Sequence, residues 1–279
     1  MSQVIKQSIP ILMYHSIAEQ ATDAFRPFAV SPAMFEQQIS YLQQQGYVSL
    51  TVTQLISYLS QPTPALPERV VVLTFDDGFA DFFSDALPIL KRYNFVATLY
   101  IATACIGSTS TWLWREGEAN RLMLNWEQIV EIQAQGIECG AHTHTHPQLD
   151  LVPLSTARLE IVQSKDLLEQ HLQQPMLSFA YPHGYHTPAV QKLVRDAGFT
   201  TACAVKYEMS HTDDDRFALA RLLAGPNTGP AEMAALLTTP PPSAAATLYK
   251  QARVPVWRLL RHYSSFVEKR QQAKGEVHA

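Results

Sequence analysis

Three shortages in the sequence exclude whole classes of protein. The chain of 279 residues contains only three cysteines, and Cys105, Cys139 and Cys203 are widely spaced. An odd number at such spacing favours neither a disulfide framework nor a thiolate metal site, so a reducing compartment is the simpler interpretation. No apolar run approaches transmembrane length, and residues 1–9 lack the pattern of a secretory signal. These absences predict a cytoplasmic protein.

Charge is also scarce. Charged residues make up 16% of the chain and the net charge is −4, which gives no electrostatic reason to expect nucleic acid as a partner. Apolar residues make up 47%, and the length is enough for one barrel-sized domain with a substantial core. The composition therefore indicates a globular protein, while its chemistry has to come from motifs.

The first chemical motif follows an apolar segment, 70–73. Four apolar residues in a row predict a strand buried on both faces, as in a parallel sheet covered by helices. Asp76, Asp77 and Gly78 come shortly after it. Neighbouring strand side chains point to opposite faces, so the carboxylates share a pocket only if the chain leaves the strand there, which Gly78 permits. Two close carboxylates need a metal or a proton, although an ordinary turn with a helix cap is the alternative.

A histidine cluster favours the metal. His142, His144 and His146 fall within five residues, and imidazole beside carboxylate suits zinc or a similar first-row cation. In a continued strand all three side chains would project to one face. In a coiled turn, His142 and His146 would instead approach each other. Gly140 before the cluster and Pro147 after it favour the turn.

Apolar periodicity along the chain alternates between strands and helices. We predict strands at 9–15, 70–73, 95–101, 137–141, 177–181, 199–205 and 217–222, and helices at 32–45, 52–59, 85–93, 125–134, 155–172 and 187–197. This alternation predicts a parallel α/β sheet, most simply a barrel. The polar clusters follow the carboxyl ends of strands, where α/β barrels place their active sites.

Segments 74–78 and 142–147 resemble the first two motifs of the polysaccharide deacetylases, the NodB-homology group of carbohydrate esterases. The resemblance covers most of residues 8–225. It implies a distorted (β/α)7 barrel. It also implies that Asp76 is the catalytic base, and that Asp77, His142 and His146 hold a divalent metal, most simply Zn²⁺. His144 then lies outside the ligand set.

The third motif departs from the family pattern. Residues 179–184 stand where deacetylases carry an Arg-Pro-Pro-Tyr-Gly-like motif, but Ala180 replaces the arginine and His183 replaces the tyrosine. By resemblance, the backbone N–H of His183 helps to bind the oxyanion. Some other cation must orient the base if that role survives, and Arg221 is the candidate, with a simple surface ion pair as its alternative.

The general acid is also unusual. The family's late Leu-x-His motif is absent after Arg221. Relatives that act on poly-N-acetylglucosamine carry a Tyr-His pair at the first strand instead, and Tyr14-His15 matches that arrangement. A histidine near neutral pKa suits protonation of an amine. His15 is therefore the predicted acid, with His183 and His186 as competitors and a capped strand end as the structural alternative.

The chain changes character in its last fifth. We predict a deacetylase domain over 1–230, a Pro/Ala-rich linker over 231–254 and a basic amphipathic helix and tail over 255–279. That helix could lie on an anionic membrane surface, or dock on the barrel or a protein partner, which we prefer. We expect it to be dispensable for chemistry, so that truncation after Gly229 leaves a folded protein.

Taken together, the sequence predicts a metal-dependent hydrolase that removes N-acetyl groups from an amino-sugar glycan. A tryptophan-bearing loop, 103–125, is either a glycan platform or a hydrophobic lid. The alternatives are a metal amidohydrolase of a small nitrogenous molecule and an inactive glycan-binding protein. The altered third motif keeps the last one open, whereas the intact Asp76 argues against it.

Overall fold

A curled parallel sheet forms the centre of the molecule. The structure, a computed structural model, describes residues 7–61, 66–238, 258 and 261. The sheet runs in the order β10 (Thr201–Cys203), β9 (Ser178–Ala180), β8 (Glu138–Ala141), β7 (Thr98–Ile101), β6 (Val70–Phe75), β2 (Ile11–Tyr14) and β12 (Leu222–Leu223), and β5 (Val48–Leu50) pairs with β6. All these pairings are parallel.

Strand β12 and the residues just before it connect the two edges of the sheet. β12 pairs with β2 at one edge, while Leu219, just before β12, bridges to Cys203 of β10 at the other edge. The Leu219 N–H donates to Ala202 O at 3.0 Å, and Ala204 N–H donates back to Leu219 O at 2.9 Å. The sheet therefore curls into the predicted distorted (β/α)7 barrel, and that prediction is confirmed.

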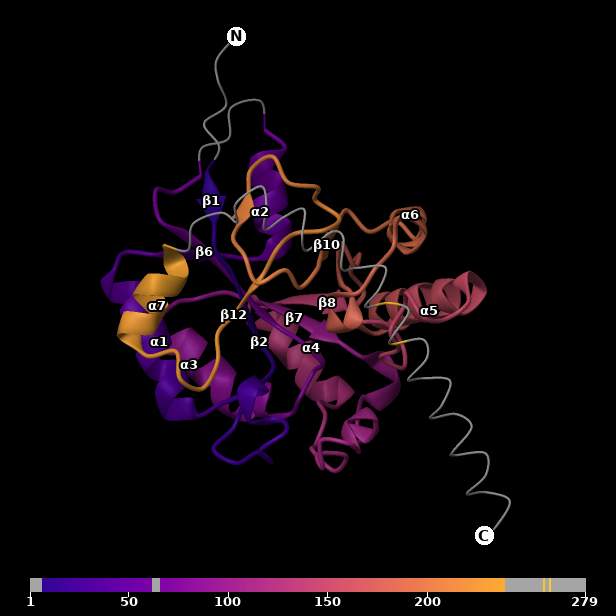
Figure 1. Cartoon of the computed structure of the whole chain (residues 1–279), viewed down its shortest axis with the longest axis horizontal. Coiled ribbons are helices and arrows are strands. Elements are labelled where there is room, and N and C mark those ends of the chain that lie inside the picture. Colours follow the sequence, from indigo (N-terminus) through magenta and orange to yellow (C-terminus); the bar gives the residue numbers. More distant parts are fainter. Residues whose placement is uncertain (1–6, 62–65, 239–257, 259–260, 262–279) are drawn as a thin grey trace.

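Seven α-helices among the described residues surround the strands (Figure 1). They are α1 (Pro32–Gln44), α2 (Val52–Leu59), α3 (Leu87–Arg92), α4 (Trp126–Ala134), α5 (Leu154–Leu172), α6 (Pro188–Asp196) and α7 (Pro230–Leu237). Their starts follow local chemistry, because Ser31 caps α1 ahead of a proline, and Thr51 and Asn125 form capping boxes. A π-helical turn, Phe82–Ala86, precedes α3.

Two small ribbons lie at opposite ends of β2. β1 (Ser8–Ile9) pairs antiparallel with β11 (Ser210–His211), and β3 (Ser16–Ile17) pairs with β4 (Ala29–Val30). Short 3-10 turns occupy Arg26–Phe28, Thr103–Cys105, Thr111–Leu113 and Pro182–Gly184. The last three of these turns follow the carboxyl ends of β7 and β9, so irregular backbone gathers at the rim where the polar motifs lie.

Alternation along β6 divides the core. Val71, Leu73 and Phe75 belong to the large cluster of buried apolar residues shared with the helices. Val70 and Val72 belong to a second cluster that includes residues of β2, β7 and β9. This second set faces the barrel interior, so Thr74 and Asp76, on the same face by the two-residue period, continue that inward row.

The two largest errors among the boundaries predicted from the sequence concern the last strand and the linker. The last strand is confined to Leu222–Leu223 rather than 217–222, because Asp215 turns the chain and its side chain accepts the Phe217 N–H at 2.9 Å. The linker cannot begin at 231, because α7 extends to Leu237. Its Met233 is fully buried, and α7 contacts α1.

The burial of α7 also corrects the expected truncation point. Cutting after Gly229 would remove part of the core, so a cut that spares the barrel has to follow Thr238. The rest of the predicted linker, and all of the predicted tail except Arg258 and Arg261, lie outside the described residues. In the part of the chain that the structure describes, no helix is long and apolar enough to cross a membrane.

Candidate active site

Both carboxylates of the first motif lie in one buried cluster of polar side chains. Asp76 continues the inward row of β6, and Asp77 follows with a positive φ of 77°, then Gly78 with a φ of 87°. These left-handed residues end the strand's alternation, so the two side chains no longer point to opposite faces. The residues are only 3% and 4% exposed. The predicted departure from the strand at this point is confirmed, although Asp77 itself takes the left-handed conformation along with the glycine.

The histidine segment coils rather than continuing β8. Thr143 and His146 have φ values of 66° and 61°, which brings His142 and His146 to within 4.9 Å of each other between ring centroids. Asp77 Oδ1 lies 3.4 Å from His142 Nε2 and 3.2 Å from His146 Nε2. The ligand atoms of the three buried residues all lie within 4.8 Å of one another.

His144 lies outside this group. Its Nδ1 is 2.9 Å from Thr103 Oγ1, and its Nε2 is 3.2 Å from the Gln163 side-chain nitrogen. The Glu160 carboxylate accepts the backbone N–H groups of His144 and Thr145. His144 therefore serves to anchor the coiled segment to α5 and the β7 loop.

The geometry of the three residues fits a divalent cation. Nitrogen and oxygen ligands at about 2.0–2.2 Å from a tetrahedral ion stand about 3.4 Å apart, which the separations of 3.4 and 3.2 Å match. A charge-assisted hydrogen bond would be shorter, at about 2.7–2.9 Å. His142 Nδ1 lies 2.8 Å from Ala180 O. Donation of its proton there leaves Nε2 as a lone-pair ligand, the usual arrangement at metal sites.

Electrostatics keeps the Asp77 carboxyl ionised. Burial raises its pKa, but the adjacent His146 and His142 imidazoles outweigh this and hold the pKa well below its ordinary value. Conversely, burial lowers the pKa of His142, whereas Asp76 and Asp77 raise it above its ordinary value. The pocket is thus built around negative charge, which a cation can neutralise.

Arg221 grips Asp76 inside the barrel. Its two terminal nitrogens donate to the two carboxylate oxygens at 2.6 and 2.8 Å, and its Nε donates to Ala204 O at 3.1 Å. The arginine side chain is fully buried. Burial raises the pKa of Asp76, but Arg221 and His142 outweigh it, and the net shift is downward. Arg221 is therefore no surface ion pair: it fixes Asp76 as a carboxylate in one orientation.

His15 reaches the same rim from β2. Tyr14 pairs with Phe75 in the parallel register, and the Asp76 N–H donates to Tyr14 O at 3.0 Å, so the next residues, His15 and Asp76, are neighbours at the strand ends. Its Nδ1 is buried and has no hydrogen-bond partner among the described residues. Burial lowers the pKa of His15, against the opposing effects of Asp77 and Asp76. The structure thus places an imidazole nitrogen without a described hydrogen-bond partner on the residue next to Asp76 at the strand ends.

His183 lies next to the Asp77–His142–His146 group (the metal group). Its φ of 57° and that of Gly184, 76°, make the turn after β9. A Cβ on Gly184 would lie 2.5 Å from the Val205 nitrogen, so glycine is required there. The His183 ring stands 4.9 Å from that of His146. Burial and the nearby His146 lower the pKa of His183 to about 3, so its ring is neutral. His186 stacks on Tyr181 at 4.5 Å.

The tryptophans in the 103–125 loop and the adjacent Trp126 do not form one platform. Trp112 lies over the site, with its ring 5.0 Å from that of His146 and 6.3 Å from that of Phe79. Trp126 instead stacks on His171 at 3.7 Å, on helix α5. Trp114 is 57% exposed. Of the predicted aromatic surface, only Trp112 therefore adjoins the metal group.

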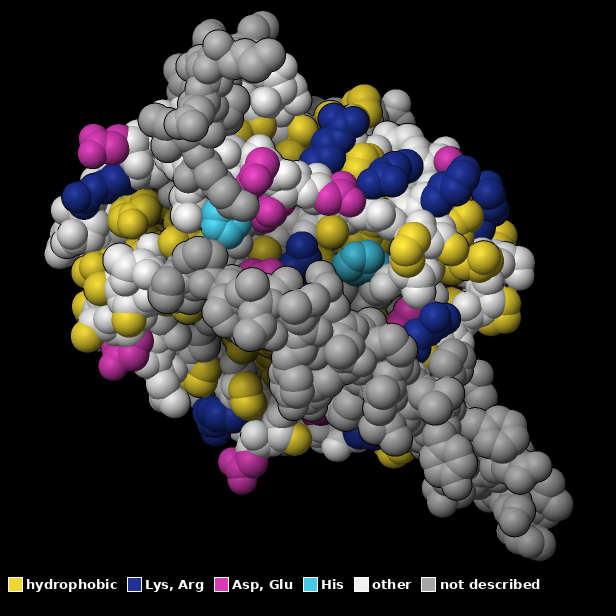
Figure 2. Space-filling view, turned by 45° about the horizontal axis from the view of Figure 1, so that its top comes forward, with side chains coloured by type: hydrophobic (Ala, Val, Ile, Leu, Met, Phe, Trp, Pro, Cys, Tyr) yellow, Lys and Arg dark blue, Asp and Glu magenta, His cyan; other side chains and the backbone are white. Residues whose placement is uncertain are grey.

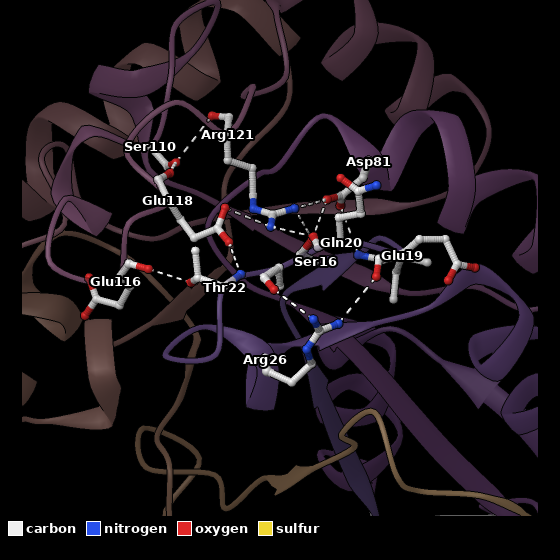
Figure 3. Close-up of polar contacts among 12 residues, drawn as sticks. Ser16, Glu19, Gln20, Thr22, Arg26, Asp81, Ser110, Glu116, Glu118 and Arg121 are labelled. Atoms are coloured by element: carbon white, nitrogen blue, oxygen red, sulfur yellow. Dashed lines mark hydrogen bonds and ion pairs between the residues drawn. The ribbon is translucent and has the colours of Figure 1, made fainter.

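A polar network that the sequence did not reveal ties the rim loops together (Figure 3). Arg121 donates to Ser16 Oγ, Gln20 O and Glu118 Oε2, each at 3.0 Å. Ser16 donates in turn to Asp81 at 2.5 Å. The network joins the residue after His15, the turn after the two aspartates and the 103–125 loop. No local sequence pattern predicted this network, because its members are far apart in the sequence and lie in irregular segments.

On the face shown in Figure 2, histidine side chains reach the surface among interspersed positive and negative side chains.

The fold and the site together define a class of protein: an α/β-barrel hydrolase whose rim holds an ionised aspartate beside an Asp-His-His group.

Comparison with known proteins gives the family. The sequence model of the polysaccharide deacetylase family matches residues 63–202, and the chain belongs to that family of hydrolases. A Bacillus subtilis (strain 168) protein named as a polysaccharide deacetylase, YxkH, is 28% identical over 218 residues, which are 78% of this chain and 72% of that protein.

Two further relatives extend the comparison. The poly-beta-1,6-N-acetyl-D-glucosamine N-deacetylase of Staphylococcus aureus (strain MRSA252) is 24% identical over 205 residues, 70% of this chain and 68% of that one. The solved structure of the Streptococcus pyogenes deacetylase PplD, in complex with acetate, superposes with a TM-score of 0.72 at 27% identity, covering 83% of this chain and 98% of that one.

Proposed function

We propose that this chain is a metal-dependent deacetylase that hydrolyses N-acetyl groups of an N-acetylglucosamine-type glycan. One observation carries the proposal: a buried Asp77–His142–His146 group lies beside Asp76, which Arg221 holds ionised. Similarity to a relative named for poly-β-1,6-N-acetylglucosamine supports the choice of glycan. The ligand set of two imidazoles and one carboxylate suits Zn²⁺.

The chain's own residues supply the proton chemistry. When bound, a divalent cation acts as a Lewis acid on the acetamide carbonyl and makes water a better nucleophile. Asp76 accepts the proton of the attacking water as general base. Arg221 keeps that carboxylate charged and aimed, taking the role of the arginine replaced by Ala180. The backbone N–H of His183 donates to the developing oxyanion.

His15 completes the reaction by protonating the departing amine. It stands next to Asp76 at the strand ends, and its Nδ1 has no partner in the described part of the chain. His183 is the weaker candidate, because its pKa is lowered to about 3 by burial and His146, whereas both Asp77 and Asp76 oppose the lowering of the His15 pKa by burial. A ring that is neutral throughout the working range is a poor proton donor, because the N–H of neutral imidazole is far less acidic than that of imidazolium.

Acetate release decides the proposal. Metal-free protein, reconstituted separately with Zn²⁺, Co²⁺, Mn²⁺ or Mg²⁺, is assayed on β-1,6- and β-1,4-linked N-acetylglucosamine oligomers and on a small N-acetylated amine. We expect metal-dependent release from an oligomer, greatest with Zn²⁺, and none from Asp76→Asn. Release from the small amine alone would instead support the amidohydrolase alternative, and release without metal would overturn the mechanism.

A further inference from the structure

A second buried carboxylate lies just beyond the metal group. Asp150 follows His146 by four residues, in the segment that leads from the coiled histidine motif to α5. Its side chain is only 4% exposed. Asp150 has no role in the proposed reaction and is not among the proposed metal ligands. Because it is buried, another group has to balance its charge.

Two arginines from the C-terminal segment balance the charge of Asp150. Arg261 donates to the two Asp150 oxygens at 3.0 and 2.6 Å and to Gln148 Oε1 at 2.7 Å. Arg258 donates to the Asp150 carbonyl from Nε at 3.0 Å and from a terminal nitrogen at 2.7 Å. This C-terminal arginine pair (Arg258 and Arg261) thus neutralises the carboxylate and satisfies the backbone of the segment that follows His146.

Arg261 also contacts the other wall of the site. Its guanidinium carbon lies 3.5 Å from the centroid of the Tyr185 ring, a stacking distance at which a cation is attracted to the aromatic face. Tyr185 directly follows the His183–Gly184 turn, and its ring stands 6.2 Å from that of His183. One guanidinium therefore joins the segment that carries His146 to the turn that carries His183.

We propose that Arg261 is a positioning residue, which holds the His146 segment against the His183 turn through Asp150 and Tyr185. The bidentate fork fixes Asp150, and the stacked face fixes Tyr185, so the distance between the metal ligand and the oxyanion donor is set from outside the barrel. The importance for turnover rests on the proposed function. The importance for metal affinity rests only on the Asp-His-His group.

The proposal gives the basic C-terminal segment an intramolecular role. The sequence pattern allowed a membrane surface or docking on the barrel, and the contacts of Arg258 and Arg261 favour docking. Arg261 is only 11% exposed at its side chain and Arg258 is 43% exposed. An arginine enclosed between a carboxylate and an aromatic ring has little charge left to offer to lipid headgroups.

Full-length Arg261→Met and Asp150→Asn test the proposal against a matched control. Arg195→Met removes an arginine that likewise pairs with an aspartate, Asp215, and lies 4.6 Å from an aromatic ring, Phe217, so that these contacts involve neither Asp150 nor Tyr185. We measure the Zn²⁺ dissociation constant of each metal-free protein by chelator competition, then kcat and KM for acetate release.

We expect Arg261→Met to bind Zn²⁺ about 10- to 100-fold more weakly, the usual effect of losing an outer residue that orients a ligand. Its kcat should fall with little change in KM, while Arg195→Met should match the wild type. Asp150→Asn keeps the shape without the charge and should show the same metal defect. The double variant should be no worse than the worse single one, because both changes break one contact.

Three results would overturn the proposal. The first is wild-type metal affinity in both Arg261→Met and Asp150→Asn. The second is full additivity in the double variant. The third is a loss confined to binding of phosphatidylglycerol vesicles, which would assign the arginine pair to membranes. If the wild type releases no acetate from any glycan, the proposed function fails, but the metal-affinity series still tests the positioning role.

Discussion

Two aspartate–arginine pairs flank the carboxyl end of β6, and they differ in almost every respect. The inner pair, Asp76–Arg221, lies inside the barrel with two direct contacts of 2.6 and 2.8 Å and a fully buried arginine. The outer pair, Asp81–Arg121, lies among the rim loops, with 3.6 Å between its charged atoms. Asp81 instead accepts hydrogen bonds from Ser16 Oγ at 2.5 Å and Ile17 N–H at 3.1 Å.

The two carboxyl pKa values shift in opposite directions. For Asp76, burial raises the pKa but Arg221 prevails and the net shift is downward. For Asp81, burial also raises the pKa, and the bonds from Ser16 and Ile17 with the more distant Arg121 do not compensate, so the net shift is upward. A bidentate fork maintains a buried charge, whereas a looser arginine mainly links neighbouring segments. The inner geometry suits the general base that we propose, whereas the outer geometry links the rim loops.

Breaking the inner pair should have the largest effect. Arg221→Met leaves the Asp76 carboxylate buried without its partner, which typically costs about 3–5 kcal/mol. We expect the free energy of unfolding in urea to fall by that amount and acetate release to be nearly abolished. Arg221→Lys should recover part of the stability but little of the rate, because an ammonium cannot reproduce the fork. Wild-type stability in Arg221→Met would show that the pair contributes nothing.

Removing a metal ligand should abolish the stabilisation by Zn²⁺, whereas substitutions outside the ligand set should leave it intact. A ligand present at about 100 times its dissociation constant stabilises the native state by about 2.7 kcal/mol. We expect Zn²⁺ to raise the unfolding free energy of wild type, Arg121→Met and His144→Ala, but not of His146→Ala. Metal analysis of the purified variants gives the same information directly. Loss of metal in His144→Ala with retention in His146→Ala would reverse the ligand assignment.

His15 lies between the two pairs, and its removal should affect rate alone. His15→Ala should keep its metal and its fold but lose about 100- to 10,000-fold in kcat, the usual contribution of a positioned acid. Circular dichroism and metal content serve as controls. Near-normal turnover in His15→Ala, together with a large loss in His183→Ala, would transfer the acid role to the third motif.

The sequence revealed the inner pair but not the outer one, for a physical reason. Asp76 and Asp77 follow a strongly apolar strand, where the apolar run predicts the element, and the histidines form a dense cluster between Gly140 and Pro147. Arg221 could be inferred because a missing cation had to be replaced. Arg121 lies in a loop without periodicity, and its partner Ser16 is 105 residues away. The same applies to Asp150 and Arg261, separated by 111 residues.

Boundaries failed where tertiary contacts override local preference. The segment before β12 is apolar, yet residues near Asp215 form a turn, Leu219 makes only an isolated bridge to Cys203, and the strand begins at Leu222. The composition after Gly229 suggests a linker, yet Pro230 begins a helix whose Met233 enters the core. Neither the Asp215 side-chain bond nor the contact between α7 and α1 can be deduced from local composition.

Loosening the outer pair should reduce the rate of acetate release less than the changes at Arg221 and His15 do. Arg121→Met removes the bonds to Ser16, Gln20 and Glu118, but Asp81 keeps those from Ser16 and Ile17. We expect a loss of about 1–3 kcal/mol in the free energy of unfolding. The rate loss should stay below that of His15→Ala, and faster hydrogen exchange should be confined to the segments around Ser16 and the 103–125 loop. Hydrogen exchange that accelerates throughout the barrel would contradict a role confined to linking the rim loops.

The smallest expected effect is a pH dependence that distinguishes the two aspartates. The raised pKa of Asp81 means that the folded state binds its proton more tightly than the unfolded state does. Its contribution to stability is therefore fully present below the ordinary aspartate pKa, and it is lost as pH rises through the raised folded value. Asp81→Asn has no such titration, so the stability of the wild type relative to this variant should grow as pH falls from 7 towards about 4. Urea unfolding of both proteins across that range measures the difference. A relative stability that shrinks on acidification would mean that Arg121 prevails over burial after all, and that the outer pair maintains a charge just as the inner pair does.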